Sequence, residues 1–431
     1  MNRLIAISIG LLCVLATQNA SAVPSYQFSG SNLAGGNLPR PGVSLSALTN
    51  PAGASYVQGL RPSMFSIGII SSIGITTEVG AIDNLSEDLD RLADELDRTD
   101  LSLDEANDLV DEFNSILVRM GEDGYLKIGA FAHVPLFPLI SSSEFLGGNL
   151  TLDVNLQSLS KLTILDDPLS ANPISGSLDT NTSLYVKNAR VTEFSLAYSR
   201  LLKKFATGNL FGGLKLGMYE MELSKTVSPL SEVDDIADVL EDDLDRYEAI
   251  NSGIGLDVGV IWDAGSWYLG AAVLNILEPD FDYGEIGTDC GQLVDADAQA
   301  NCFAAVSYQT RISLKENHLL NTGLRLQGGY NISSNWSLGG FYDVTAMTDP
   351  VGDENQYAGL GLEYRGGWFV PSFRTGIRTN LADNGLSYTN FGFTFFNLVN
   401  LDLSLSNEKV EVDGDSSSRA IALNLGLDFT F

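Results

Sequence analysis

The chain has few of the residues that mark an active site, a redox centre or a nucleic-acid surface. Its 431 residues include three cysteines, two histidines and 24 lysines and arginines, against 55 aspartates and glutamates. The formal net charge of −31 excludes nucleic acid as a partner, because that interaction needs lysine and arginine to neutralise phosphates. No C-x-x-C motif is present, so the sequence contains no dithiol redox motif.

Long apolar runs are also missing after the first 22 residues. A membrane-spanning helix needs about 20 such residues, yet 44% of the chain is hydrophobic. If this chain enters a membrane, it must cross as a closed β-barrel, because lipid tolerates no unpaired backbone N–H and C=O groups.

Residues 1–22 have the pattern of a cleaved secretory signal. A positive charge at Arg3 precedes an apolar run that ends near Ala16, and Ala20-Ser21-Ala22 supplies the small residues that a signal peptidase recognises. The run is too short to span a bilayer comfortably. We therefore expect the chain to be exported without a membrane anchor, and the residues before Cys13 do not fit a lipoprotein signal.

The two remaining cysteines flank an acidic loop, CGQLVDADAQANC. In an exported protein, this arrangement favours a local disulfide over a metal or redox site. We expect Cys290 and Cys302 to bond to each other.

The two histidines do not fit known catalytic patterns. Outer-membrane phospholipases place a serine and a histidine two residues apart on a strand, and neither His133 nor His318 has that spacing. Metal-ligand clusters are absent from the sequence, and the acidic residues 411–418 lack the twelve-residue calcium-loop pattern. We expect no enzymatic activity, no cofactor and no bound metal.

The end of the chain alternates strictly between apolar and polar residues. Residues 422–431 read ALNLGLDFTF, with an apolar residue at every odd position. This period of two is typical of a strand with one apolar and one polar face.

Aromatic residues also lie near the ends of many alternating segments, as in the girdles of outer-membrane barrels: Tyr125, Tyr185, Tyr198, Trp262, Trp267, Tyr268, Tyr330, Trp336, Tyr342, Trp368, Phe369, Phe395 and Phe396.

Fifteen alternating segments predict an antiparallel all-β transmembrane β-barrel. Because a bacterial barrel has an even number of strands, we expect about 14 strands, with 16 as the alternative. Short turns alternate with long acidic loops. Assigning each connection to one side of the membrane from either terminus gives two assignments that differ by one strand between about 303 and 335. One strand is therefore missing or counted in excess in that region. Besides the C-terminal strand, the segments are 64–82, 124–138, 150–156, 184–200, 209–225, 254–260, 267–277, 303–314, 321–331, 336–347, 357–365, 368–378, 386–396 and 401–405.

Two acidic inserts, 84–120 and 231–248, are expected to be helical. Leu85, Leu89, Leu92 and Leu96 recur at helical spacing, and a second stripe begins at Val233. Capping boxes precede both halves of the first insert, at residues 84–87 and 102–105. The apolar stripes favour packing on the barrel itself, although a partner protein remains an alternative.

Residues 23–62 precede the first strand and are rich in glycine, serine, proline and asparagine. A barrel of about 14 strands is too wide for its own side chains to fill, so we expect this segment to plug the lumen of a barrel formed by residues 63–431. Within it, Asn50-Pro51-Ala52-Gly53 is a turn signal. The first three of these residues resemble the NPA motif in the lumenal hatch of the FadL family, which implies that Asn50, Pro51 and Ala52 sit in a plug that moves or binds ligand.

Two further resemblances concern the whole chain. The pattern ending at Leu427, Phe429 and Phe431 resembles the signal that the outer-membrane barrel-assembly machinery recognises. NLSEDLDRLADEL, GEDGYLKIGAFAHVPLFPL and LDVGVIWDAGSWYLGAAVLNILEPDFDY resemble TraF-like proteins labelled for conjugal transfer, a family grouped with FadL-like barrels. This resemblance implies transport of hydrophobic molecules across the outer membrane of a Gram-negative bacterium.

Three functions remain open at this stage. The first is FadL-like passive uptake or export of a hydrophobic small molecule, the second a role in a conjugation or secretion apparatus, and the third a general porin. The expected partners are outer-membrane lipid and lipopolysaccharide, the barrel-assembly machinery and a hydrophobic ligand.

Overall fold

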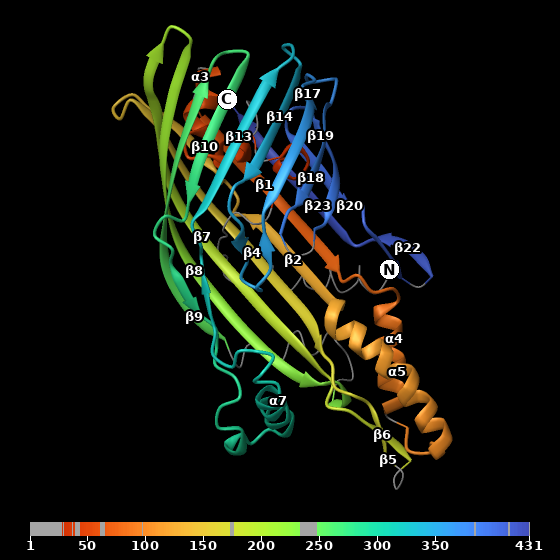
Figure 1. Cartoon of the computed structure of the whole chain (residues 1–431). Helices are drawn as coiled ribbons and strands as arrows, with labels where there is room; N and C mark the ends of the chain where they lie inside the picture. Colours follow the sequence, from red (N-terminus) through yellow and green to blue (C-terminus); the bar gives the residue numbers. More distant parts are fainter. Residues whose placement is uncertain are drawn as a thin grey trace.

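The chain forms a closed antiparallel β-barrel (Figure 1). The computed structural model describes residues 28, 30–36, 38, 44–60, 65–96, 98–172, 176–232, 248–382, 385–412 and 414–430. Fourteen strands form the ring, which closes where β23 (Ala420–Thr430) pairs with β1 (Phe65–Val79). The prediction of about 14 strands in an all-β barrel is confirmed.

The strands differ greatly in length. β7 and β8 have 23 and 22 residues, about twice what a tilted strand needs to cross a bilayer. One side of the wall therefore projects beyond the membrane, and Figure 1 shows β7 and β8 reaching farther than the strands on the opposite side. The other strands of the ring are β2 (Tyr125–His133), β4 (Gly148–Leu165), β7 (Ser183–Phe205), β8 (Gly208–Pro229), β9 (Ala249–Asp263), β10 (Trp267–Leu274), β13 (Gly323–Asn331), β14 (Trp336–Asp343), β17 (Tyr357–Tyr364), β18 (Ser372–Asn380), β19 (Ser387–Phe395) and β20 (Val399–Ser406).

The strand expected at residues 303–314 is wrong. Helix α7 (Ala296–Ser307) occupies the first part of this segment and begins at Asp295, whose side chain accepts a hydrogen bond from the backbone N–H of Ala298. Its buried residues Ala298, Cys302 and Ala305 follow a helical spacing that the aromatic and β-branched residues of the segment obscured. Removing this segment leaves 14 strands and accounts for the miscount between 303 and 335.

The alternation along β23 has the predicted orientation. Asn424 is 0% exposed and faces the lumen, whereas Leu425 is 52% exposed on the outer surface. On β8, the outward residues change from apolar (Leu214, Met218) to acidic at Glu220, which indicates where the hydrocarbon region ends. A barrel that is apolar outside and polar inside belongs to the bacterial outer membrane.

The two ends of the barrel are unequal, as predicted. Short turns such as 264–266 and 332–335 connect the strands at one end, whereas segments as long as 80–124 and 275–322 connect them at the other. Because short turns of such barrels are periplasmic and long loops extracellular, the long loops are assigned to the cell exterior. Exposed aromatic side chains lie at or beside the short turns: Trp267, Tyr330, Trp336, Trp368, Phe369 and Phe396.

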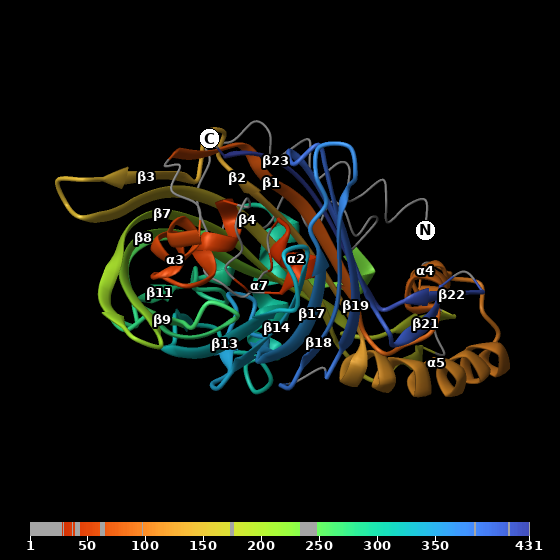
Figure 2. The ribbon, with the colours of Figure 1, turned by 90° about the horizontal axis from the view of Figure 1, so that it is seen from above.

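The first acidic insert forms two helices outside the ring (Figure 2). They are α4 (Leu85–Leu96) and α5 (Leu103–Asp123), and their apolar stripes pack against outward residues of β4 and β7, including Ile164 and Val186. The predicted cap at Ser102 forms, since its side chain accepts from the N–H of Glu105. The cap expected at Asn84 is wrong, because its side-chain oxygen has no hydrogen-bond partner. Most of the second insert, residues 233–247, lies outside the described residues.

Extracellular loops fold over the end of the lumen. Strands β11 (Asp280–Asp282) and β12 (Asn317–Leu319) pair. Phe281 of β11 and Leu320, which directly follows β12, join lumenal residues of β7, β8 and β10 in one apolar cluster. The disulfide between Cys290 and Cys302 ties the 3-10 helix η4 (Cys290–Gln292) to α7. The remaining short elements are β3 (Leu139–Ser143), β5 (Ser170–Asn172), β6 (Ser177–Asp179), β15 (Met347–Thr348), β16 (Glu354–Asn355), β21 (Lys409–Val412), β22 (Asp415–Ser418) and η2 (Leu230–Glu232).

In the part of the chain that the structure describes, no helix is long and apolar enough to cross a membrane.

Candidate functional site

The segment before β1 lies within the ring of strands (Figure 2). It contains α2 (Asn32–Gly35), the 3-10 helix η1 (Ser44–Thr49) and α3 (Gly53–Leu60). Leu33, Leu45 and Ala52 are each at most 2% exposed. The segment therefore packs against the inner wall through buried contacts.

Asn50, Pro51 and Ala52 form a turn between η1 and α3. The side-chain amide of Asn50 donates to the backbone carbonyl of Ala271 on β10 at 3.2 Å, and its oxygen accepts from the N–H of Ala52 at 2.9 Å. The Asn50 carbonyl accepts from the N–H of Gly53 at 2.7 Å. One asparagine thus closes the turn and joins it to the barrel wall.

Two glycines of the wall allow this close approach. A Cβ atom added at Gly213 on β8 would lie 2.0 Å from the Pro51 carbonyl oxygen, and one added at Gly259 on β9 would lie 2.2 Å from Asn50 Oδ1. Such distances are far inside van der Waals contact. Gly213 and Gly259 therefore form a socket for the turn that a larger residue would obstruct.

Helix α3 is held by a polar and an aromatic contact. Ser55 Oγ accepts from the side-chain amide of Asn149 at 2.6 Å and lies 2.9 Å from Ser199 Oγ. On the other side, the ring of Tyr56 packs on Tyr268, with the ring centroids 4.9 Å apart. These contacts connect α3 to β4, β7 and β10.

The barrel wall is irregular beside this segment. β2 and β3 occupy the same position between β1 and β4, but residues 134–138 interrupt them. Asn155 pairs with His133 and Leu152 with Leu139, so five residues of one strand face two of the next. Pro135 and Pro138 have no N–H to donate, which prevents regular pairing through this interruption.

A buried histidine and a carboxylate lie next to the interruption. His133 Nε2 is 3.5 Å from Asp153 Oδ2, and both side chains are at most 5% exposed. The other polar atoms of the pair, His133 Nδ1 and Asp153 Oδ1, have no hydrogen-bond partner. Because buried polar groups are normally satisfied, these atoms mark a polar part of the lumen.

A cavity of about 60 Å³ lies between the N-terminal segment and the wall. It is large enough for a few water molecules or part of a small solute. Phe28 and Leu33 contribute to it from the N-terminal segment, whereas Asn50, Pro51 and Ala52 do not line it. The other lining side chains include Thr76, Glu78, Lys127, Phe131, Leu159, Asn355, Tyr357, Arg378, Tyr388 and Ala422.

Arg378 is the most unusual residue of this cavity. Its guanidinium stacks over Phe28 at 4.3 Å and over Tyr388 at 4.5 Å, and it is only 8% exposed. One terminal nitrogen donates to Ser404 Oγ at 3.2 Å, while Nε and the other terminal nitrogen have no partner. Arg378 thus lines the cavity while two of its donors are buried without a partner, which is costly.

The other buried lumenal arginines have fixed partners. Arg374 lies 3.1 Å from Asp402, and both are fully buried, while Arg325 lies 2.6 Å from Asp343. Both pairs are complete within the wall, in contrast to Arg378. Arg374 and Arg378 both occupy inward-facing positions in the alternation of β18. This alternation is the sequence signal that could have identified Arg378.

The residues expected to form an assembly signal are only partly described. Leu427 pairs with Val399 and with Ile70 across the closing seam, and the backbone of Phe429 pairs with Ile67. Phe431 lies outside the described residues. Among the residues that the structure describes, no group of three or more His, Cys, Asp or Glu could hold a metal ion.

Residues 47–343 match the family model described as "F plasmid transfer operon, TraF, protein", which is more than half of the 431 residues. No protein with a curated description is similar enough in sequence to count as a relative.

Several solved structures resemble the chain over most of its length. A TodX deltaS2S3 mutant, described as a monoaromatic hydrocarbon channel, is 12% identical with a TM-score of 0.46, covering 93% of this chain and 98% of that one. The toluene transporter TodX of Pseudomonas putida is 10% identical with a TM-score of 0.40, covering 95% and 99%. A FadL homologue of Pseudomonas aeruginosa is 10% identical with a TM-score of 0.38, covering 96% and 100%. Similarity at this level carries no information about a ligand.

Proposed function

The chain belongs to the family described as F plasmid transfer operon, TraF, protein, and from this premise we propose that it is a passive outer-membrane transporter. Its solute is a small hydrophobic molecule that carries one anionic or hydrogen-bond acceptor group. The observation that carries the proposal is Arg378, which lines the cavity with two unpaired nitrogens among aromatic rings.

The cavity combines the two kinds of group that such a ligand needs. Phe28, Phe131 and Leu159 offer apolar surface, and small-molecule sites are usually apolar with a few placed polar groups. Arg378 supplies the polar group. An acceptor on the solute would pair with its free N–H donors, whereas a pure hydrocarbon would leave them unpaired.

In this proposal, the described part of the N-terminal segment is the plug and the interrupted wall is the exit. Phe131 lines the cavity and lies two residues before the end of β2, where the interruption at 134–138 begins. A solute held beside Phe28 could leave sideways there once Leu136 and its neighbours move. The turn at Asn50–Ala52 holds the plug against β8, β9 and β10 rather than touching the solute.

The test is to identify what the gently purified protein retains. We expect native mass spectrometry and solvent extraction to find an apolar molecule with a carboxylate, phosphate, hydroxyl or carbonyl group. Arg378→Met, which keeps an apolar stem and removes the donors, should lower the retained amount by roughly tenfold, since hydrogen bonds to a charged group contribute about 1.5–3 kcal/mol.

The matched control is Arg190→Met, which removes a partly exposed arginine that lies 3.5 Å from Glu222 and does not line the cavity. It should retain the molecule as the parent does. Equal retention by the folded Arg378→Met protein would contradict the role of Arg378, and a protein that retains only detergent would contradict the proposed transport of a hydrophobic solute.

A second function follows from the family description, which names a transfer operon. A conjugation or secretion component would bind a partner through the acidic outer faces of α4 and α5, because their apolar stripes are already buried on the barrel. Pull-down with the insert 84–120 intact and then deleted tests this alternative. Loss of a specific partner on deletion, with unchanged solute retention, would favour it.

A general porin is the least supported function. The β11–β12 pair and α7 pack into the extracellular end of the lumen, and the N-terminal segment packs into the other part. Steady conductance of the parent protein in planar bilayers would nevertheless favour a porin over a solute-specific transporter.

A further inference from the structure

Four lysines lie side by side on the lumenal face of the wall. Lys127 of β2 pairs in register with Lys161 of β4, Lys161 with Lys187 of β7, and Lys187 with Lys225 of β8. We refer to these residues as the lysine row. Like charges directly opposite each other on neighbouring strands repel, so the row requires negative charge from elsewhere in the fold.

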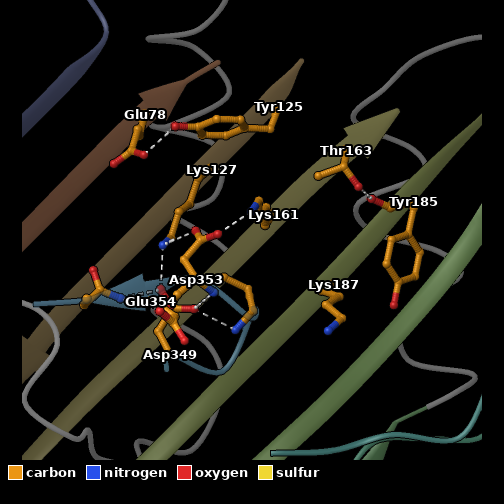
Figure 3. A network of polar contacts seen from close by, with 12 residues as sticks. Glu78, Tyr125, Lys127, Lys161, Thr163, Tyr185, Lys187, Asp349, Asp353 and Glu354 are labelled. Carbon is orange, nitrogen blue, oxygen red and sulfur yellow. Dashed lines mark hydrogen bonds and ion pairs between the residues drawn. The ribbon is translucent and has the colours of Figure 1, made fainter. Parts of the chain in front are cut away.

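One extracellular loop supplies two of the carboxylates (Figure 3). Lys127 Nζ lies 2.5 Å from Asp349 Oδ2 and 2.7 Å from Asp353 Oδ2. The second oxygen of Asp353 pairs with Lys161. Asp353 therefore bridges two members of the lysine row, and its loop is joined to two strands of the wall.

A second loop neutralises the other half of the row. Glu316 pairs with Lys187 and lies 3.5 Å from Lys225, whose ammonium also donates to the Ser313 carbonyl at 2.6 Å. Both ammonium groups lie over the ring of Tyr283, at 5.0 and 5.6 Å from its centroid. The loop that carries β12 is thus joined to β7 and β8.

The loop with Asp349 and Asp353 is a compact unit. Asp349 Oδ1 accepts from the N–H groups of Val351 and Asp353 at 3.1 and 3.0 Å, and Oδ2 accepts from the side chain of Asn355 at 3.3 Å. The strands on either side, β15 and β16, have only two residues each. Such a tight turn can leave the wall as one body without unfolding.

Apolar contacts and ion pairs together hold this unit in place. Met347 joins the lumenal cluster with Phe281, and Val351 is 3% exposed. By contrast, the ion pairs with Lys127 and Lys161 are mostly buried, with side-chain exposures between 3% and 19%. Removing one partner of a buried pair leaves an uncompensated charge and is strongly destabilising, so the ion pairs largely determine whether the loop stays closed.

We propose that the loops at 344–356 and 308–322 form an extracellular lid that the lysine row holds shut through Asp349, Asp353 and Glu316. The lid covers the lumen beside the cavity, since Lys127 and Asp349 both line it. A solute exchanging with the cell exterior passes only when these ion pairs separate. The use of the lid in transport rests on the proposed function, whereas its opening can be measured without any solute.

The test places a reporter on a buried residue of the lid itself. Val351→Cys introduces a buried thiol into a chain whose Cys290 and Cys302 are disulfide-bonded. A membrane-impermeant maleimide should label this thiol slowly in intact cells or proteoliposomes. Adding Lys127→Met and Lys161→Met should raise the labelling rate by roughly tenfold or more, because Asp349 and Asp353 would then be unpaired in the closed position.

Two further variants keep the test interpretable. Asp353→Asn removes the bridging charge with little change in size and should also accelerate labelling, whereas Lys161→Arg keeps the charge and should not. The matched control is Lys409→Met, which removes an exposed lysine of β21 at the same end of the barrel.

Folding of every variant is checked by the heat-dependent gel mobility of the barrel. An unchanged labelling rate in folded Lys127→Met/Lys161→Met and Asp353→Asn proteins would overturn the lid. If these variants are labelled fast but exchange solute at an unchanged rate, the proposed lid is supported and the proposed transport function is contradicted.

Discussion

At the scale of single residues, the proposed function depends on groups whose partners come from distant parts of the chain. Arg378 is next to Phe28 only because the N-terminal segment enters the barrel, and Asp353 meets Lys127 and Lys161 only because a loop folds inward. The residues that the sequence singled out, Asn50 to Ala52, hold the segment in place rather than lining the cavity.

The socket of the turn gives a prediction at this scale. Gly259→Ala should displace Asn50 and Pro51, because the new Cβ would lie 2.2 Å from Asn50 Oδ1. Overpacking of this kind typically costs about 1–3 kcal/mol. We expect faster proteolysis within residues 44–60 and a lower urea midpoint.

The matched control is Gly367→Ala, because a Cβ at Gly367 has no neighbour within 4 Å. If Gly259→Ala resists protease and urea as well as Gly367→Ala does, the turn is not held tightly against β9.

The charges of the lid also have a defined pH dependence. Burial by itself would raise the pKa of the Asp353 carboxyl, but Lys127 and Lys161 together hold this pKa below its ordinary value of 3.8. A lowered pKa means that the stabilisation is present above the ordinary value and is lost only as the pH falls below it. The loop at 344–356 should therefore keep its ion pairs with Lys127 and Lys161 in mildly acidic medium, which the labelling of Val351→Cys at pH 5 and 7 can check.

At the scale of elements, short helices and strands in the loops cover the lumen, and a short interruption alters the pairing of the wall. The disulfide, α7 and the β11–β12 pair cover one end of the lumen. The interruption at residues 134–138 breaks the pairing of a wall that is otherwise regular at β2 and β4. Sequence reasoning read 124–138 as one strand, since alternation does not reveal where the pairing between neighbours stops.

The β11–β12 pair should loosen in acid through His318. Burial, assisted by the nearby charge of Lys187 and opposed by Asp349, Asp280 and Glu316, lowers the pKa of His318 from 6.5 to about 4. The neutral imidazole therefore stabilises the folded pair above pH 6.5, and this contribution is lost as the pH falls towards 4. The loss is about 3 kcal/mol at most, from the size of the pKa change.

Hydrogen exchange of the β11–β12 pair between pH 7 and 4, corrected for intrinsic rates, measures this effect. We expect protection to fall across this range in the parent protein and to stay nearly constant in His318→Gln, which cannot titrate. A parent protein that keeps its protection down to pH 4 would exclude this role for His318.

At the scale of the whole molecule, the barrel separates lipid, lumen and exterior. Leu425 faces outward, and its cross-strand neighbours Ile73 and Leu401 are also exposed and apolar. At the same outer surface, Ile250 pairs in register with Glu222, beyond the apolar belt. A charged side chain should therefore destabilise the barrel at Leu425 and be tolerated at Ile250.

Arginine substitutions test this orientation. Leu425→Arg should destabilise the barrel by about 2–4 kcal/mol if the residue lies near the midplane of the bilayer, whereas Ile250→Arg should cost little. Urea titration of refolding into lipid vesicles measures both. Equal costs at the two positions would contradict the assigned membrane boundary. Ile250 serves for the comparison in place of the adjacent lumenal residue Asn424, because Asn424 is fully buried and accepts a hydrogen bond from Ser72 Oγ at 2.5 Å.

The sequence by itself determined the class of fold and its orientation in the membrane. Alternation with a period of two is a local property of each strand, so it established the outward and inward faces of β23 and the strand count to within one segment. The apolar stripe of α4 was equally readable, because helical spacing is also local.

Only the tertiary structure decided where the chemistry lies. The lysine row depends on the register between β2, β4, β7 and β8, and the aromatic cage of Arg378 depends on a chain segment that enters the lumen. Register and insertion are set by contacts between residues far apart in the chain, and no local period encodes them. The pattern of one strand therefore specifies its two faces but not the side chains that its residues meet.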